Sequence, residues 1–352
     1  MQNKAARIFL AAITAVVVFL VVNAGITLFS SYSPKEIQEI SLVGEKQSDS
    51  LSPDKIKILT FNTGHGALGE EADSKKEGGK GKRQPVDTVL KNTRGISEII
   101  NLSSADAVLL QDVDVDSHRS RYVDQFSYYL GNGSYIGAFA RDYSTRSTSL
   151  LPPYNKVEAG LLTLSKKNIV SAERVALPLG YSGPSSALNP KRAMLVTRFD
   201  IKDSDKKLVL INFEIDAYTS DKNREKQIKA VVDYAEKAAE NGDYVVCGGS
   251  FHSYFDDTDD RYPVSDRIQW EPEQFDSTTL KSGWLLCYDA SVPTARVLNK
   301  PFDVKTPYEE RQVYVGDGIL VSPNVEVKMV VTVDQQFRYS NHNPVLLEIS
   351  LK

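Results

Sequence analysis

The sequence lacks the features that define several common protein classes. It holds only two cysteines, Cys247 and Cys287, among 352 residues, so it has no disulfide framework and room for one bridge at most. It has no excess of basic charge, because its formal net charge is −4. The chain therefore has no overall positive field of the kind that would attract a nucleic acid. We also find no internal repeat and no boundary that would separate two globular domains.

Long apolar runs are rare as well, and the one that is present lies near the N-terminus. Residues 8–29 are apolar with few interruptions, and roughly 20 apolar residues are enough to span a bilayer. Lys4 and Arg7 precede the run, and no comparable basic cluster follows it closely. This asymmetry predicts a cytoplasmic segment 1–7, a single transmembrane anchor 8–29 and an extracytoplasmic domain. The alternative is a signal peptide cleaved near residues 22–24.

The rest of the chain divides into a polar tether and one domain. Residues 30–54 are polar and patternless, which predicts a linker between membrane and domain. The domain, 55–352, opens with the alternating apolar pattern of a strand at 56–61. Residues 70–85 are rich in Gly, Lys and Glu, a composition typical of a mobile solvated loop. The alternative for this segment is a basic flap that covers an anionic ligand.

Strands and helices are predicted to alternate through the domain, with some strands pairing consecutively. Apolar periodicity indicates helices at about 86–100 and 220–241. Strands are predicted at 106–113, 160–165, 193–199, 208–215, 244–247, 284–288, 313–321, 325–333 and 344–351. This order favours an α/β (α+β) fold in which a mixed sheet system carries its helices on the outside.

Several of the predicted strands end in loops with polar residues, and such loops commonly carry binding and catalytic groups. The segments, in chain order, are Phe61-Asn62-Thr63-Gly64-His65-Gly66, Leu110-Gln111-Asp112-Val113-Asp114, Asn212-Phe213-Glu214-Ile215-Asp216, Gly248-Gly249-Ser250-Phe251-His252-Ser253, Gly316-Asp317-Gly318 and Ser340-Asn341-His342-Asn343-Pro344. In order, spacing and local sequence they resemble the endonuclease/exonuclease/phosphatase superfamily, the fold of DNase I and the neutral sphingomyelinases. The likeness covers nearly all of 56–352, and it is strongest to exported bacterial members.

The resemblance implies a four-layer sandwich of two packed mixed β-sheets flanked by helices. It also implies divalent-metal-dependent hydrolysis of phosphoesters with Mg²⁺, because oxygen ligands hold that hard cation and the cation offsets charge on the phosphoryl group. At the matching positions Asn62, His342 and Asp317 are retained. Asp112 stands in place of the family's metal-binding Glu and keeps its charge on a shorter side chain.

Four other matching positions differ in chemical type. Glu214 replaces a His that contacts phosphate, and Asn341 replaces an Asp that the resemblance assigns to orienting His342. Ser250 and His252 replace the Asp and Asn of the Gly-Asp-Phe-Asn signature. Because groups that act as a unit lose activity together, the sequence predicts a weak or absent family reaction on an intact scaffold.

Two functional hypotheses follow, together with a purely structural role that no residue supports directly. The first is a pseudoenzyme that binds a phosphorylated small molecule, a lipid head group or a protein. The second is an active phosphoesterase whose site is rebuilt around Zn²⁺ or Mn²⁺. The residues available for such a site are His65, His252, His342, Asp112 and Glu214. Arg119 is predicted either to contact phosphate or to pair with Asp114 or Asp116.

Overall fold

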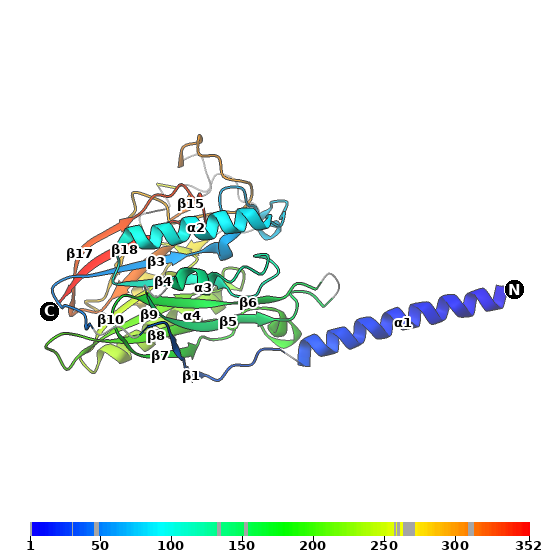
Figure 1. Cartoon of the computed structure of the whole chain (residues 1–352), viewed down its shortest axis with the longest axis horizontal. Helices are drawn as coiled ribbons and strands as arrows, with labels where there is room; N and C mark the ends of the chain where they lie inside the picture. Colours follow the sequence, from blue (N-terminus) through cyan, green and yellow to red (C-terminus); the bar gives the residue numbers. More distant parts are fainter. Residues whose placement is uncertain are drawn as a thin grey trace.

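Two β-sheets packed face to face form the domain, and helices cover their outer faces (Figure 1). The computed structural model describes residues 2–29, 31–45, 49–131, 135–150, 154–256, 258, 261–262, 272–308 and 313–352. The described helices are α1 (Gln2–Phe29), α2 (Val86–Ser103), α3 (Gln125–Leu130) and α4 (Asp221–Ala239), with short 3₁₀ turns η1 (Gly64–Gly66), η2 (Lys75–Glu77), η3 (Gly183–Leu188) and η4 (Ser277–Thr279).

Each sheet contains seven described strands. The first sheet runs in the spatial order β1 (Ile37–Glu39), β7 (Ile169–Ala176), β8 (Ala193–Asp200), β9 (Lys207–Glu214), β10 (Tyr244–Ser250), β16 (Asp317–Val321) and β13 (Leu285–Cys287). The second runs β17 (Val325–Thr332), β18 (Val345–Leu351), β3 (Ile56–Asn62), β4 (Ala107–Asp114), β6 (Val157–Ser165), β5 (Ile136–Thr145) and β2 (Leu42–Val43). Two small strand pairs join β11 (Ser253–Tyr254) to β12 (Glu273–Gln274) and β14 (Ala295–Arg296) to β15 (Val313–Tyr314).

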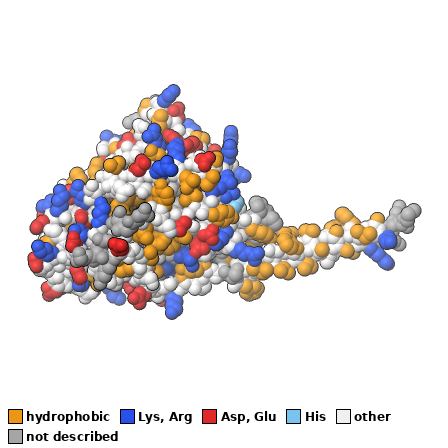
Figure 2. Space-filling model, viewed as in Figure 1, with side chains coloured by type: hydrophobic (Ala, Val, Ile, Leu, Met, Phe, Trp, Pro, Cys, Tyr) orange, Lys and Arg blue, Asp and Glu red, His pale blue; other side chains and the backbone are white. Residues whose placement is uncertain are grey.

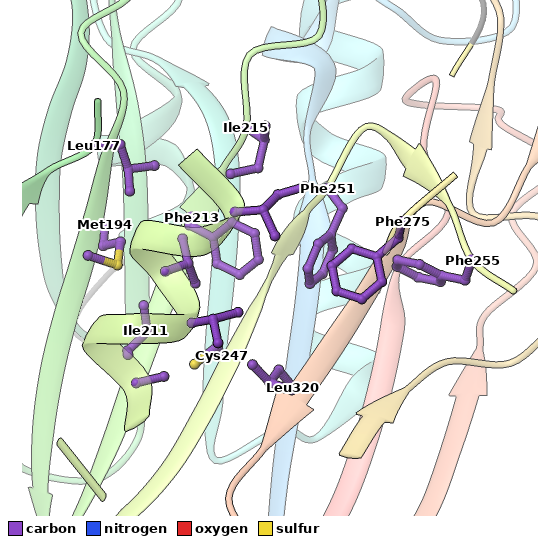
Figure 3. Packing of buried hydrophobic residues seen from close by; sticks show 14 of the residues in the cluster. Leu177, Met194, Ile211, Phe213, Ile215, Cys247, Phe251, Phe255, Phe275 and Leu320 are labelled. Carbon is purple, nitrogen blue, oxygen red and sulfur yellow. The ribbon is translucent and has the colours of Figure 1, made fainter. Parts of the chain in front are cut away.

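Alternating residues of the strands build three apolar layers. Between the sheets, Ile58 and Leu109 of the second sheet pack in one cluster with Leu210 of the first. Outside the second sheet, the apolar face of α2 packs against β3 and β4. Outside the first sheet, α4 packs against β9 and β10, and aromatic side chains extend that cluster past the ends of the strands (Figure 3). The predicted four-layer sandwich is therefore confirmed.

Parallel pairs at the centre of each sheet bring the loops of interest to one end. β3 pairs in parallel with β4, and β9 pairs in parallel with β10, so the carboxyl ends of all four strands meet at the same edge. Directly beneath this edge, the buried side chain of Gln111 donates to the side-chain oxygen of Asn212 at 2.7 Å. Asn212 in turn donates to the backbone carbonyl of Leu110 at 3.0 Å. Since unpaired buried amides are costly, this link holds the two sheets in register below the site.

The structure corrects several sequence predictions. Strands β5 and β7 were not predicted, because small and polar residues obscure their alternation. The predicted strand 313–321 is two short strands, β15 and β16. Residues 30–54, expected to be a patternless tether, carry β1 and β2, which pair with β7 and β5. Both cysteines are buried free thiols.

Helix α1 projects from one end of the sandwich (Figure 1). Residues 4–29 of this helix are long and apolar enough to cross a membrane. A helix of this length and composition suits either a membrane anchor or a signal sequence.

Candidate functional site

A cavity of about 530 Å³ lies at the edge where the four central strands end. All four histidines of the chain line it. Seven Lys and Arg side chains face only four Asp and Glu side chains around it, whereas the whole chain carries a net charge of −4. Arg119 and Arg192 are paired with carboxylates at or just behind the lining. The positive charge that would favour an anionic occupant therefore lies on the other lining cations, Lys75, Lys76, Lys82, Arg83 and Arg296.

The first cluster in the cavity joins His65, Asp112 and Arg119. His65 Nδ1 lies 2.8 Å from Asp112 Oδ2, and Arg119 Nη2 donates to Asp112 Oδ1 at 2.5 Å. Arg119 also donates to the fully buried Asp114 at 2.7 Å, which confirms one of the two roles predicted for it. Burial opposes ionisation of the Asp112 carboxyl, but Arg119 and then His65 outweigh burial and hold its pKa well below the usual value.

The second cluster joins Glu214, His252 and Arg192. Arg192 makes a two-pronged contact with the Glu214 carboxylate, at 2.7 and 3.0 Å, and His252 Nε2 lies 3.5 Å from Glu214 Oε1. Arg192 also bonds Asp142 at 2.8 Å and Asp216 at 3.1 Å. Burial opposes ionisation of Glu214, yet Arg192 keeps its pKa lowered. The three carboxylates of Asp142, Glu214 and Asp216 therefore share the single guanidinium of Arg192. Burial, together with the negative charge of Glu214, raises the pKa of Asp142 to about 6.

The third cluster is a buried hydrogen-bond chain from Asn62 to His342. Asn62 Nδ2 donates to Ser250 Oγ at 3.1 Å, and Ser250 Oγ donates to Asp317 Oδ1 at 2.5 Å. His342 Nδ1 lies 2.7 Å from Asp317 Oδ2. Burial lowers the pKa of His342, but Asp317 more than offsets it and the net shift is upward.

This chain corrects the role that the resemblance gave to position 341. Asp317, rather than the residue at 341, holds His342 in place. The Oδ1 atom of Asn341 is buried and has no hydrogen-bond partner in the described part of the chain. Asn341 nevertheless lines the cavity, where an unpartnered acceptor is available to a ligand donor.

Three residues of these clusters have a strained backbone. His65, Asp112 and His252 have backbone φ values of 42°, 52° and 49°, a conformation that residues other than glycine rarely adopt. Strained residues of this kind gather at functional sites, where surrounding structure holds them in place. The strain therefore supports a binding or catalytic role for this edge rather than a purely structural one.

The donor set does not fit the Mg²⁺ that the resemblance implies. Both oxygens of Asp112 are engaged, Oδ2 by His65 and Oδ1 by the Arg119 guanidinium. His65, His252 and His342 each contact a different carboxylate. Among the residues that the structure describes, no group of three His, Cys, Asp or Glu side chains is placed to hold a metal. The same finding counts against the Zn²⁺ or Mn²⁺ arrangement.

Residues 70–85 form one wall of the cavity. Glu77 is buried and accepts hydrogen bonds from the Tyr218 hydroxyl and the Leu298 backbone N–H. Arg83 Nη1 lies 2.7 Å from His118 Nε2, and the buried Arg83 Nε has no partner in the described residues. The segment is thus packed on the domain, unlike the solvated loop that its composition suggests, and it presents basic groups to the cavity.

The structure brings most of the predicted site residues together. Asn62, Asp112, Arg119, Glu214, His252, Asn341 and His342 line the cavity, whereas Ser250 and Asp317 are not among its lining residues. Sequence reasoning missed Arg192, the central cation of the second cluster. A signal for it exists: Arg192 directly precedes β8, and β8 runs antiparallel to β9. The start of β8 must therefore lie beside Glu214 at the end of β9.

Known proteins match this chain in structure and not in sequence. No protein-family model and no curated protein matches it. An endonuclease/exonuclease/phosphatase from Beutenbergia cavernae aligns with a TM-score of 0.57 and 14% identity, over 85% of this chain and 72% of its own. One from Bacteroides vulgatus aligns with a TM-score of 0.53 and 16% identity, over 85% and 99%. The human Nocturnin catalytic domain, with a bound sulfate anion, aligns with 0.52 and 16%, over 89% and 98%.

At these identities the likeness defines the fold. The chain has the endonuclease/exonuclease/phosphatase fold, as its sequence resemblance predicted. Its candidate site lies where the central strands of both sheets end, and it contains three carboxylate–histidine pairs, two of them also held by an arginine.

Proposed function

We propose that this chain is a membrane-anchored pseudoenzyme that binds a phosphate-bearing anion in the cavity without metal-dependent hydrolysis. The observation that carries the proposal is that arginine side chains of the protein itself contact the carboxylates of Asp112 and Glu214, where an enzyme of this fold would use a metal ion or a histidine. Arg119 occupies the carboxylate at the family's metal position, and Arg192 occupies the carboxylate that replaces the phosphate-contacting His. A guanidinium fixed at each of these places neutralises the carboxylate there, as a divalent ion would in an enzyme of this fold.

The remaining cations of the cavity suit a phosphate group. Lys75, Lys76, Lys82 and Arg83 line it, and no ion pair joins them to an acidic residue in the described part of the chain. Hydrogen bonds from charged donors to phosphate are among the stronger polar contacts. A phosphorylated small molecule, a lipid head group and a phosphorylated protein all offer that group. Lys4 and Arg7, which lie in the first turns of α1 ahead of its apolar run, support an extracytoplasmic domain.

The alternative function is phosphoester hydrolysis at a site rebuilt around Zn²⁺ or Mn²⁺. His342 with Asp317 keeps the geometry of an oriented general acid or base. For the alternative to hold, a metal would have to displace Arg119 or Arg192 from its carboxylate. Breaking a buried ion pair on one side commonly costs 3–5 kcal/mol, roughly, so the pairing observed here weighs against this function.

Two measurements on the full chain in detergent test the proposal. Calorimetry with inorganic phosphate in the presence of a chelator should detect saturable binding, because the cations in the cavity belong to the protein. Assays with generic phosphodiester and phosphomonoester substrates and added Mg²⁺, Mn²⁺ or Zn²⁺ should detect no turnover above the blank. A restored variant should run beside the wild type, with the substitutions Asp112→Glu, Glu214→His, Ser250→Asp, His252→Asn and Asn341→Asp.

The controls separate the two functions. Metal-dependent turnover by the wild type that disappears in His252→Ala would establish the alternative. Turnover that persists in His252→Ala and His342→Ala indicates a contaminating hydrolase. Failure of phosphate to bind in the absence of metal would overturn the proposed binding function.

A further inference from the structure

The mouth of the cavity carries an exposed basic surface. We call Lys75, Lys76, Lys82 and Arg83 the basic rim; all four line the cavity, and the three lysines are exposed. Lys76 Nζ stacks over the Tyr218 ring at 4.3 Å, and Arg83 contacts His118. No described acidic side chain forms an ion pair with any member of the rim. The rim therefore presents its charge outward, to solvent or to a partner.

The rim lies at the end of the domain from which α1 emerges. Figure 1 shows the segment between β3 and α2 at the same end of the sheets as α1. The last turns of α1 contact η3, and Thr27 in those turns is 3% exposed. Tyr181 before η3 and Asn189 after it both line the cavity. The helix end and the cavity mouth are thus joined through a single short element.

The chain that follows α1 is held against the domain rather than free to swing. Tyr32 donates from its hydroxyl to the Arg141 carbonyl at 3.2 Å, and Arg174 donates to the Lys35 carbonyl at 3.3 Å. Strand β1 then pairs with β7. If α1 stays in the membrane, the domain therefore sits directly on the bilayer surface with little spacer between them.

The surface at this end has the composition of a membrane-facing one. Lys and Arg side chains gather on the domain near the base of α1 (Figure 2). Next to the rim, Tyr122 is 54% exposed and packs edge-on to His118, with ring centroids 6.1 Å apart. Basic residues near an anionic bilayer are attracted to its head groups, and tyrosine is enriched at the interface between lipid and water.

We propose that the cavity mouth faces the bilayer that holds α1 and that its occupant is the anionic phosphate head group of a lipid in that bilayer. This inference rests on the proposed function, because the same cavity binds the phosphate. Anchoring restricts the mouth to the membrane surface, so lipid head groups reach it at a high effective concentration. A soluble phosphate ester would have to compete with them.

The test compares the full chain in nanodiscs of phosphatidylcholine alone with nanodiscs that also contain phosphatidic acid. A ligand that binds only the folded state raises the melting temperature. We expect the domain to melt higher in the anionic discs, by roughly 2 °C or more, and backbone hydrogen exchange in residues 75–84 to slow. Lys75→Glu/Lys82→Glu should abolish both effects. Lys202→Glu/Lys237→Glu, which reverses two exposed lysines outside the cavity lining, should retain them.

A third arm adds inorganic phosphate to the phosphatidylcholine discs. Stabilisation by phosphate together with equal melting in both kinds of disc would place the ligand in solution and overturn the membrane inference, while the proposed function stands. No effect of phosphate or of anionic lipid would overturn both. Equal loss of the lipid effect in the two double variants would mean that the rim has no special role, and it would also overturn the inference.

Discussion

Two histidines that line the cavity, His342 and His118, differ in their neighbours, and their pKa values move in opposite directions. His342 is the most buried of them, at 3% exposure, and Asp317 stabilises its charged form so that its pKa is raised. His118 lies next to Arg83 and Arg121, and burial together with these cations lowers its pKa. The two residues therefore make opposite contributions to the dependence of stability on pH.

The first prediction concerns His342→Gln. Since the folded-state pKa of His342 is raised, its stabilisation is fully present below the ordinary value of about 6.5 and is lost as pH rises through the raised value. The variant should lack this loss, so its free energy of unfolding should fall less between pH 6 and pH 8, roughly, than that of the wild type. Urea unfolding of the domain at a series of pH values measures the difference.

His118→Gln is the matched control. The lowered pKa of His118 predicts that the folded state resists its protonation, so the wild type loses stability as pH falls below about 6.5. This variant should remove that acid-side loss and leave the alkaline side unchanged. Parallel pH profiles for His342→Gln and the wild type would contradict the assignment of the His342–Asp317 pair.

At the scale of elements, the segment between β3 and α2 shows how a polar sequence becomes part of a site. Its composition is that of a solvated loop, yet Glu77 is buried at 4% exposure. The Glu77 carboxylate accepts from Tyr218 and from the Leu298 backbone, which belong to distant parts of the chain. Asp73 accepts from the backbone of Lys80 and Gly81. These contacts fold the segment into a wall that carries the basic rim.

The second prediction is that Glu77→Gln loosens this wall. Glutamine keeps one acceptor oxygen, which can serve the Leu298 N–H, but its N–H₂ group then faces the Tyr218 hydroxyl, so the hydrogen bond from that hydroxyl to a charged carboxylate is lost. The expected cost is about 1–3 kcal/mol in the free energy of unfolding, with faster tryptic cleavage between residues 75 and 83. Glu71→Gln is the control, because Glu71 is 41% exposed in its pair with Lys91, and such pairs contribute about 1 kcal/mol or less. Equal protease sensitivity in the two variants would contradict the anchoring role of Glu77.

At the scale of the whole molecule, the domain begins earlier than its composition indicates. Residues in the expected tether complete both sheets: β1 covers the edge of β7, and β2 covers the edge of β5. Leu51 is 1% exposed and bridges to Ile201. The connection between α1 and the sandwich is consequently short, which is the basis of the membrane-facing orientation proposed above.

The third prediction is that a fragment that starts at residue 55 is less stable than one that starts at residue 34. Removing 34–54 empties the site of Leu51, and loss of a buried leucine side chain costs about 2–5 kcal/mol. It also uncovers two strand edges, which promotes association between chains. The shorter fragment should melt several degrees lower, roughly, and elute partly as aggregate in size-exclusion chromatography. Coincident melting curves and elution volumes would show that the segment is a tether after all.

Most strands and helices could be predicted from local patterns, whereas only a minority of the residues that line the cavity could be named from the sequence. Strands such as β3, β4 and β9 are buried and strongly apolar, so their periodicity is visible along the chain, and polar residues at their ends stand out. β5 escaped prediction because Gly137, Ala138 and Ala140 carry little hydrophobic signal, although β5 is fully paired with β6. The sequence resemblance named the site positions, and the fold confirmed by related structures brings most of them to one cavity.

The sequence by itself determined a mixed sheet system with outer helices, the apolar N-terminal helix and the residue types at the site, because periodicity and residue type are local properties. The four-layer sandwich was implied by the family resemblance. Only the tertiary structure decided what each changed residue contacts. Arg192 and Glu214 are 22 positions apart and Asp317 and His342 are 25, and either carboxylate could have faced a metal, a ligand or solvent. Ion pairing depends on distance and burial, which the packing of the two sheets sets. That packing placed Arg119 on Asp112 and Arg192 on Glu214, contacts that residue type alone does not fix.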